Sequence, residues 1–438
     1  MPEYALYFIS GLIFRFMLAA IGLFVAAIYE PSVYGEFASA YSVSTALITL
    51  LISGVLEYLL VTKYSDIWEG LFKKALFVTV LVYVFFICWL FLYGGELFFL
   101  VATWLLFYRM LTAYFSTYFQ KRQLYGRLFY IQISQSIGFL FILLYVFMFY
   151  IDLDKTIFFA AWVASLIIMS SVLYKLNFSL GSRKHLQGNV FRASWRYSLA
   201  ALLSYAYMTS SIVIIRYVVG PEEAGIYALA LSFLLMVFSI FDILYKYYLN
   251  KFSEVSSGDR GGDLLFIMVF LGGCAVSFLY FNLPVLVSVF GVEYTGSQNI
   301  LKFIIPLIYV HAFIFYFVFL LTVNGMLKDR NKVQVIVALI AVLLNAILVI
   351  NFNINGAVWG FITSEVLLFV GYFYMARNLF KIRNVSRVSI AFSGVALYSF
   401  ILGVLSLIEM DLYTSFVLSM VLSICPLFLY RESFKKIL

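Results

Sequence analysis

Residues 264–289 read LLFIMVFLGGCAVSFLYFNLPVLVSV, a stretch without a single charged side chain. The hydrocarbon core of a bilayer is about 30 Å thick, and a helix needs about 20 apolar residues to cross it. Lipid offers no hydrogen-bond partners, so a chain segment in the core must satisfy its backbone polar groups internally, as a helix does. The stretch therefore predicts a transmembrane helix.

The composition extends this prediction to the whole chain. Hydrophobic residues make up 65% of the 438 residues, charged residues only 11%, and the mean hydropathy is +1.03. A typical soluble domain has about 25% charged residues. A water-exposed surface cannot be built from so few polar side chains, which excludes a soluble domain and predicts an all-α integral membrane protein.

About 14 segments (12–14) reach the length of a span. The first, Tyr4–Ile28, is expected to be a transmembrane helix and not a cleaved signal peptide, because it has no basic start and no small-residue cleavage site. We predict an N-terminal six-helix bundle at residues 1–176, a basic linker at 177–196, a C-terminal six-helix bundle at 197–377 and an additional helix pair at 378–438. The predicted spans of the second bundle are Tyr197–Val219, Ala224–Leu249, Leu264–Val289, Ile300–Val323, Lys332–Phe352 and Gly356–Arg377.

Lysine and arginine orient the chain, because the cytoplasmic loops of membrane proteins are enriched in both. With both termini placed in the cytoplasm, most of the 29 basic residues fall in inner loops, whereas the outer connections are short and acidic. The predicted location is a bacterial inner membrane. The net charge of +8 is then explained by membrane topology, and nucleic acid is not expected as a partner.

An internal repeat relates the two predicted bundles. Residues 28–42 read IYEPSVYGEFASAYS and residues 218–232 read VVGPEEAGIYALALS, so an offset of 190 aligns Pro31 with Pro221 and Gly35 with Gly225. An even number of spans per half makes the repeat parallel, with a pseudo-two-fold axis along the membrane normal and a central cavity. The alternative is that proline and glycine simply mark two tight turns.

The stretch EPSVYGEFASAYSVSTALITLLISGVLEYLLV and its echo GPEEAGIYALALSFLLMVFSIFDILYKYYL resemble polysaccharide-export flippases of the Wzx type. That family belongs to the superfamily that includes MATE multidrug exporters and the lipid II flippase MurJ. The resemblance implies a flippase, and not an enzyme, for undecaprenyl-pyrophosphate-linked repeat units of O-antigen or capsule. It also implies membrane lipids as surroundings, and a polymerase and a chain-length regulator of the same polysaccharide pathway as partners.

Two arginines are predicted deep in the membrane. Arg15 and Arg109 lie about 16–18 Å from the ends of their spans at 1.5 Å per residue. A charge at this depth costs about 2.5–3.5 kcal/mol on insertion scales and usually faces a wet cavity or a partner. Guanidinium groups bind phosphate oxygens through two parallel hydrogen bonds. Both arginines are therefore candidates for binding the pyrophosphate; the alternative is a structural ion pair with Glu57 or Glu365.

The remaining intramembrane charges give weaker candidates. Arg216 is a third candidate for substrate binding, although its position near Gly220 also allows it to reach the outer interface. Glu365, near the middle of its span, is the leading candidate for coupling to H+ or Na+, followed by Glu57 and Asp242. Asp242 has an alternative role, because Lys246 lies four residues further along the same predicted helix. His311 is expected to be a buried polar group or a proton relay.

No cofactor, catalytic residue or metal site is predicted. The sequence has no Gly-x-x-x-x-Gly-Lys-Ser/Thr phosphate loop, so transport would be secondary. Its three cysteines lie in apolar segments, as small buried hydrophobic residues do. A MATE-like cation antiporter is the alternative function. A membrane polymerase or ligase is a weaker one, because the outer loops are short.

Overall fold

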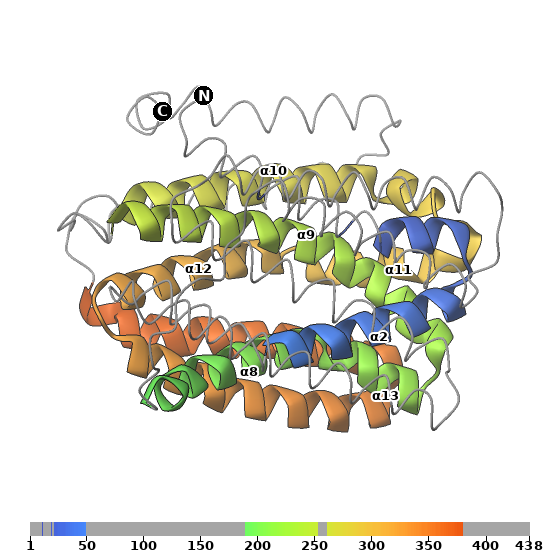
Figure 1. Cartoon of the computed structure of the whole chain (residues 1–438). Helices are drawn as coiled ribbons and strands as arrows, with labels where there is room; N and C mark the ends of the chain where they lie inside the picture. Colours follow the sequence, from blue (N-terminus) through green and yellow to red (C-terminus); the bar gives the residue numbers. More distant parts are fainter. Residues whose placement is uncertain (1–10, 12–18, 20–21, 50–188, 253–260, 380–438) are drawn as a thin grey trace, which may run out of the picture. The chain divides into compact units, whose positions relative to one another are not determined.

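The computed structural model describes residues 22–49, 189–252 and 261–379, together with residues 11 and 19 (Figure 1). Each long segment in these ranges is a helix. The chain divides into two compact units, Met1–Ala228 with Val342–Ile354, and Leu229–Ala341 with Asn355–Leu438. The predicted bundles, and the count of about 14 spans, depend on residues outside the described ranges and stay predictions.

In the first unit, α2 (Pro31–Ile48) packs along α8 (Asn189–Val218). α2 begins with Pro31, and α9 (Pro221–Phe252) begins with Pro221. Proline suits the first helical position, because its ring has the helical φ and its missing N–H would have no partner there. α8 begins at Asn189, within the segment 177–196 that we assigned to the linker, and not at Tyr197.

In the second unit, α10 (Gly261–Ser288) packs along α12 (Leu307–Val323). α12 is buried on nearly all sides, and its buried side chains include Phe313, Tyr316 and Phe317. α10 contains the uncharged stretch with which the sequence analysis began, and it continues through Pro284 without ending. An apolar helix that is buried all round forms the core of its unit.

The predicted span Ile300–Val323 is divided in two. After the short 3-10 helix η2 (Val292–Tyr294), α11 (Thr295–Ile304) and α12 meet at a bend of 52°. Pro306 lies at the break and caps α12. A proline has no N–H to donate, and its ring clashes with the carbonyl of the preceding turn, so it interrupts the helix. The segment predicted as one span is therefore bent at Pro306.

α13 (Leu327–Ala376) contains two predicted spans, joined at a sharp kink, and is followed by the 3-10 helix η3 (Arg377–Leu379). The backbone at Asn353 leaves the helical region, with φ 53° and ψ −134°. This kink separates the predicted spans Lys332–Phe352 and Gly356–Arg377, as the sequence indicated. The two ends of α13 contact each other, since a Cβ on Gly371 would lie 2.6 Å from a methyl group of Val333.

Large apolar side chains cover one face of α13. They are 44–66% exposed and recur every three or four residues: Ile336, Leu339, Ile340, Leu343, Ile347 and Ile350. In water such a stripe would require a covering partner. By length and composition, three described helices can cross a membrane: Pro221–Tyr245, Leu264–Ser288 and Lys328–Ala376, and the bent pair Val292–Ile304 and Leu307–Val323 adds a fourth if it forms one span. The stripe on α13 is therefore expected to face lipid.

The kink at Asn353 predicts that replacing asparagine with glycine raises the melting temperature at the kink and lowers it in the regular helix. Asn353→Gly should raise the melting temperature in detergent, because glycine adopts a positive φ without steric cost and asparagine does not. Asn351→Gly, two residues earlier in regular helix, should lower it slightly, by about 0.3 kcal/mol of stability, because asparagine is itself a weak helix former. Thermal unfolding followed by tryptophan fluorescence measures both. A loss of stability in both variants would show that the Asn353 side chain itself holds the kink.

Candidate functional site

The two copies of the repeated sequence contact each other in the first unit. A Cβ on Gly35 would overlap the carbonyl oxygen of Pro221, and a Cβ on Gly225 would overlap the carbonyl oxygen of Pro31. The same built Cβ on Gly35 would lie 2.9 Å from the Gly225 nitrogen. Each glycine thus faces the start of the other helix, in the reciprocal manner of a contact across a two-fold axis.

The glycines have a different role from the one expected of turn residues. Gly35 and Gly225 both lie inside helices, on the first turns of α2 and α9. Their lack of a side chain lets the two helix starts approach at backbone distance, as small residues do between membrane helices. The reading of two unrelated tight turns is therefore wrong for these positions.

Small side chains in both helices are buried. Ala38, Ala40, Ala228 and Ala230 are buried. The hydroxyl of Ser39 donates to the Gly35 carbonyl at 2.7 Å, and that of Ser42 donates to the Ala38 carbonyl at 2.8 Å. Such bonds keep serine hydroxyls satisfied within their own helix in a low-dielectric environment. The aligned alanines of the repeat therefore serve packing.

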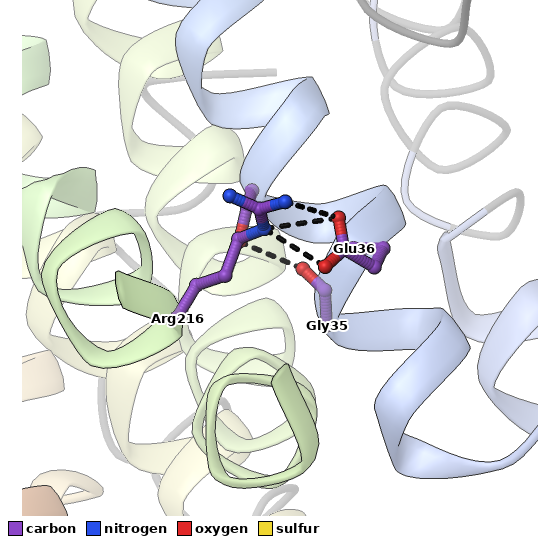
Figure 2. Close-up of polar contacts among 4 residues, drawn as sticks. Gly35, Glu36 and Arg216 are labelled. Atoms are coloured by element: carbon purple, nitrogen blue, oxygen red, sulfur yellow. Dashed lines mark hydrogen bonds and ion pairs between the residues drawn. The ribbon is translucent and has the colours of Figure 1, made fainter. Parts of the chain in front are cut away.

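An ion pair lies beside the glycine contact. Figure 2 shows Arg216, from the last turn of α8, directed at Glu36 of α2, next to Gly35. The Nε of Arg216 lies 2.9 Å from both carboxylate oxygens, and a terminal nitrogen lies 2.8 Å from Oε2. The Arg216 side chain is 12% exposed and that of Glu36 is 29% exposed. The guanidinium group also lies 4.6 Å from the centre of the Tyr217 ring.

The ion pair breaks the symmetry of the repeat. The offset of 190 that relates the glycines places Ala26 opposite Arg216 and Ile226 opposite Glu36. Where the repeat would place a second ion pair, the sequence therefore has the apolar residues Ala26 and Ile226. A partly exposed ion pair can separate at modest cost because water solvates both charges, whereas a packed apolar contact gains nothing from water.

The second unit contains a buried pair of titratable side chains. His311 of α12 and Glu365 of α13 are 2.8 Å apart between Nδ1 and Oε2, and the side chains are 6% and 0% exposed. The ring of Phe238, from α9, stacks on the imidazole with centroids 3.5 Å apart and an interplanar angle of 8°. Phe315 contacts the imidazole edge-on at 5.0 Å. Three helices thus enclose the pair.

A second polar group lies near the start of α13. Arg330 is buried and donates to the hydroxyl of Thr322 at 3.3 Å. The same hydroxyl is 3.3 Å from that of Tyr245. Tyr372 lies within electrostatic range of Arg330, Tyr245 and Glu365. Buried polar groups therefore extend from the first turn of α13 toward the His311–Glu365 pair.

The predicted site residues have different outcomes. Arg15, Arg109 and Glu57 lie outside the described residues. Arg216 is described and binds Glu36, while Glu365 contacts His311. Asp242 is half-buried on α9. Among the residues that the structure describes, no group of three or more His, Cys, Asp or Glu side chains could hold a metal ion.

Sequence reasoning missed two partners. Glu36 was not among the candidate site residues, although a carboxylate next to the repeated glycine, where the second copy has isoleucine, was a usable signal. The pairing of His311 with Glu365 had no local signal, because the two residues are 54 positions apart.

Comparison with known proteins shows the fold. No protein-family model matches the sequence, and no curated protein does. Among solved structures, the chain is similar to the lipid II flippase MurJ in an inward closed conformation, with a TM-score of 0.57 and 13% identity over 98% of this chain and 97% of that one. A eukaryotic MATE transporter gives a TM-score of 0.55 and 16% identity over 89% and 98%. A MATE in complex with MaD3S gives 0.58 and 11% identity over 86% and 95%.

The chain therefore shares its fold with membrane transporters of the MurJ and MATE kind. At these identities the likeness is one of architecture. It agrees with the prediction of a multi-pass α-helical membrane protein.

The glycine contact predicts that adding even one methyl group at either glycine lowers the stability of the protein. Gly35→Ala and Gly225→Ala should each destabilise the protein by about 1–3 kcal/mol, since the added methyl group forces the helix starts apart. Gly22→Ala is the control, because its Cβ would meet only the Tyr34 hydroxyl, at an ordinary 3.7 Å. Melting temperatures in one detergent compare the three. Unchanged stability in both Gly35→Ala and Gly225→Ala would contradict the close approach.

The ion pair predicts a measurable coupling between its two residues. A double-mutant cycle with Glu36→Gln and Arg216→Gln should give a coupling energy of about 1 kcal/mol, as expected for a partly exposed pair. Arg216→Lys should recover only part of it, because an ammonium group lacks the planar fork. The cycle is measured by thermal unfolding at low and high salt. Additive effects of the two substitutions would mean that the pair adds no stability.

Proposed function

We propose that this chain is a secondary transporter that flips undecaprenyl-pyrophosphate-linked oligosaccharide repeat units from the cytoplasmic to the periplasmic leaflet by alternating access. The observation that carries the proposal is the reciprocal contact of the two repeated helix starts, in a chain that shares the fold of a lipid II flippase. Parallel repeats of this kind alternate the access to their substrate by rocking against each other. The membrane would be the bacterial inner membrane, with both termini in the cytoplasm.

The local geometry suits a contact that opens and closes. In the predicted orientation the starts of α2 and α9 lie at the outer side. The helix starts approach through backbone atoms at Gly35 and Gly225, and the adjacent Arg216–Glu36 pair is partly solvated. Separating a partly solvated ion pair costs little free energy, because water solvates both charges as they part. This contact would close the outer side in one state of the cycle.

The substrate class follows from the charges. Arg15 and Arg109 would bind the pyrophosphate through paired hydrogen bonds. Arg216 is engaged by Glu36, so it could bind phosphate only after that pair opens. Export of an anionic head group from an inside-negative cell is driven by the membrane potential, about 2.3 kcal/mol per charge per 100 mV. Coupling to H+ or Na+ through Glu365, Glu57 or Asp242 would add to this force.

The pathway context gives further partners. A flippase for repeat units would work beside a polymerase and a chain-length regulator, which use the same lipid-linked substrate on the outer side. The alternative function is a MATE-like cation antiporter, and the similarity of the chain to MATE structures favours it over a polymerase or ligase. A cationic substrate would require exposed carboxylates, whereas Glu365 is fully buried against His311.

Transport in liposomes tests the proposal. Purified protein should move an undecaprenyl-pyrophosphate oligosaccharide across the bilayer, and Arg15→Ala with Arg109→Ala should slow this transport at least about tenfold, because a hydrogen bond to a charged group contributes about 1.5–3 kcal/mol. Arg183→Ala with Arg260→Ala is the matched control, since it removes two arginines from predicted inner loops.

Each result has a distinct meaning. Full transport by the Arg15/Arg109 variant would retain the function and refute the pyrophosphate site. Movement of a cationic dye, with no movement of the lipid, would establish the antiporter instead.

A further inference from the structure

The His311–Glu365 pair has a charge that depends on a single proton. With one proton shared between imidazole and carboxylate, the pair is neutral overall, as either an ion pair or two uncharged groups. Without that proton, a net negative charge remains at a carboxyl group that is 0% exposed. An unpaired buried charge is strongly disfavoured, so this enclosed conformation requires the proton. In a pair this close the proton belongs to both groups.

The aromatic neighbours favour the protonated pair. The face of Phe238 lies parallel to the imidazole at 3.5 Å, and aromatic faces attract cations. Phe315 closes a second side of the ring. These apolar rings also exclude water, which strengthens the attraction between imidazolium and carboxylate. The surroundings thus fit a proton held away from solvent.

Charged and titratable side chains occur on the helices that surround the pair. α9 contributes Asp242, one turn beyond Phe238, and Tyr245. The start of α13 contributes Arg330, and its end contributes Tyr372. α12 has no charged residue besides His311, and α10 has none between Leu264 and Ser288. Arg330 is therefore the buried cation of this group, and it lies near the predicted cytoplasmic end of α13.

We propose that His311 and Glu365 form a proton-binding site, which takes up one proton when the helices close around it and releases the proton when they separate. The inference rests on the proposed transport function, and it names the coupling ion and the partner of Glu365. The proton is taken up by the imidazole–carboxylate pair and leaves to water.

The chemistry favours a proton over sodium. A hard cation binds to several oxygen ligands, from carboxylates, carbonyls and water. At this site one carboxylate oxygen is already 2.8 Å from a ring nitrogen, and two phenyl rings cover the imidazole. Imidazole nitrogen and aromatic carbon are poor ligands for Na+. The pair therefore accommodates a proton without any change in its packing.

The two histidines of the sequence, His185 and His311, allow a direct test. The full-length His185→Gln variant, labelled with 15N-histidine and reconstituted in lipid, gives ring signals from His311 alone. We expect these signals to report the loss of the shared proton as the pH is raised. Adding Glu365→Gln should abolish this change, because the ring loses its negative partner. Ser364→Ala, a neighbouring buried residue that bonds only its own helix, should preserve it.

Transport then tests coupling. In liposomes containing a pH-sensitive dye, wild type should move protons opposite to the undecaprenyl-pyrophosphate lipid. His311→Gln and Glu365→Gln should lose this proton movement and the acceleration of transport by a pH gradient, while Ser364→Ala keeps both. Ring signals that do not change with pH would overturn the proton site. Equal acceleration of Glu365→Gln and wild type by a pH gradient would overturn its coupling role. Failure of the lipid to move would refute the proposed function, whereas the NMR result would still judge the proton site.

Discussion

The contact between Gly35 and Gly225 is the constraint on which the geometry of the first unit depends. Two helices can meet at backbone distance only where neither has a side chain, and the overlap of a built Cβ with the opposite proline carbonyl shows how little room remains. In the same unit α2 packs along α8, and Arg216 of α8 reaches Glu36 beside Gly35. The absence of a side chain at both positions thus permits the close packing of this region.

The two described ion pairs manage charge in an apolar environment in different ways. Arg216 and Glu36 remain partly solvated, so the pair can separate without leaving a bare charge in lipid. His311 and Glu365 are enclosed and contact each other beside the ring of Phe238. The partly solvated Arg216–Glu36 pair suits a contact that opens. The enclosed His311–Glu365 pair suits a contact that releases a proton when it opens. Both properties are useful to a transporter, and neither contributes much to stability for its own sake.

The fold shared with MurJ and MATE transporters persists at 11–16% identity. Physical chemistry explains why. Lipid-facing positions such as the exposed stripe of α13 require only apolar side chains, so many residues are equivalent there. Strict requirements are confined to a few places, where helices approach closely, bend or enclose a polar group. Gly35, Pro306 and Glu365 are residues of this kind, and each is explained by its own local geometry.

The sequence by itself determined the helical membrane class, the positions of most described helices and the existence of the repeat, because hydropathy and proline position act locally. It also indicated the division of α13 near Asn353, where polar residues interrupt two apolar runs. Only the tertiary structure decided that the repeated glycines lie against each other, that Arg216 binds Glu36 and that His311 meets Glu365. His311 and Glu365 are 54 residues apart in the sequence, and Arg216 and Glu36 are 180 residues apart. A one-dimensional pattern records which residues are buried, whereas the choice of partner depends on how separate helices pack.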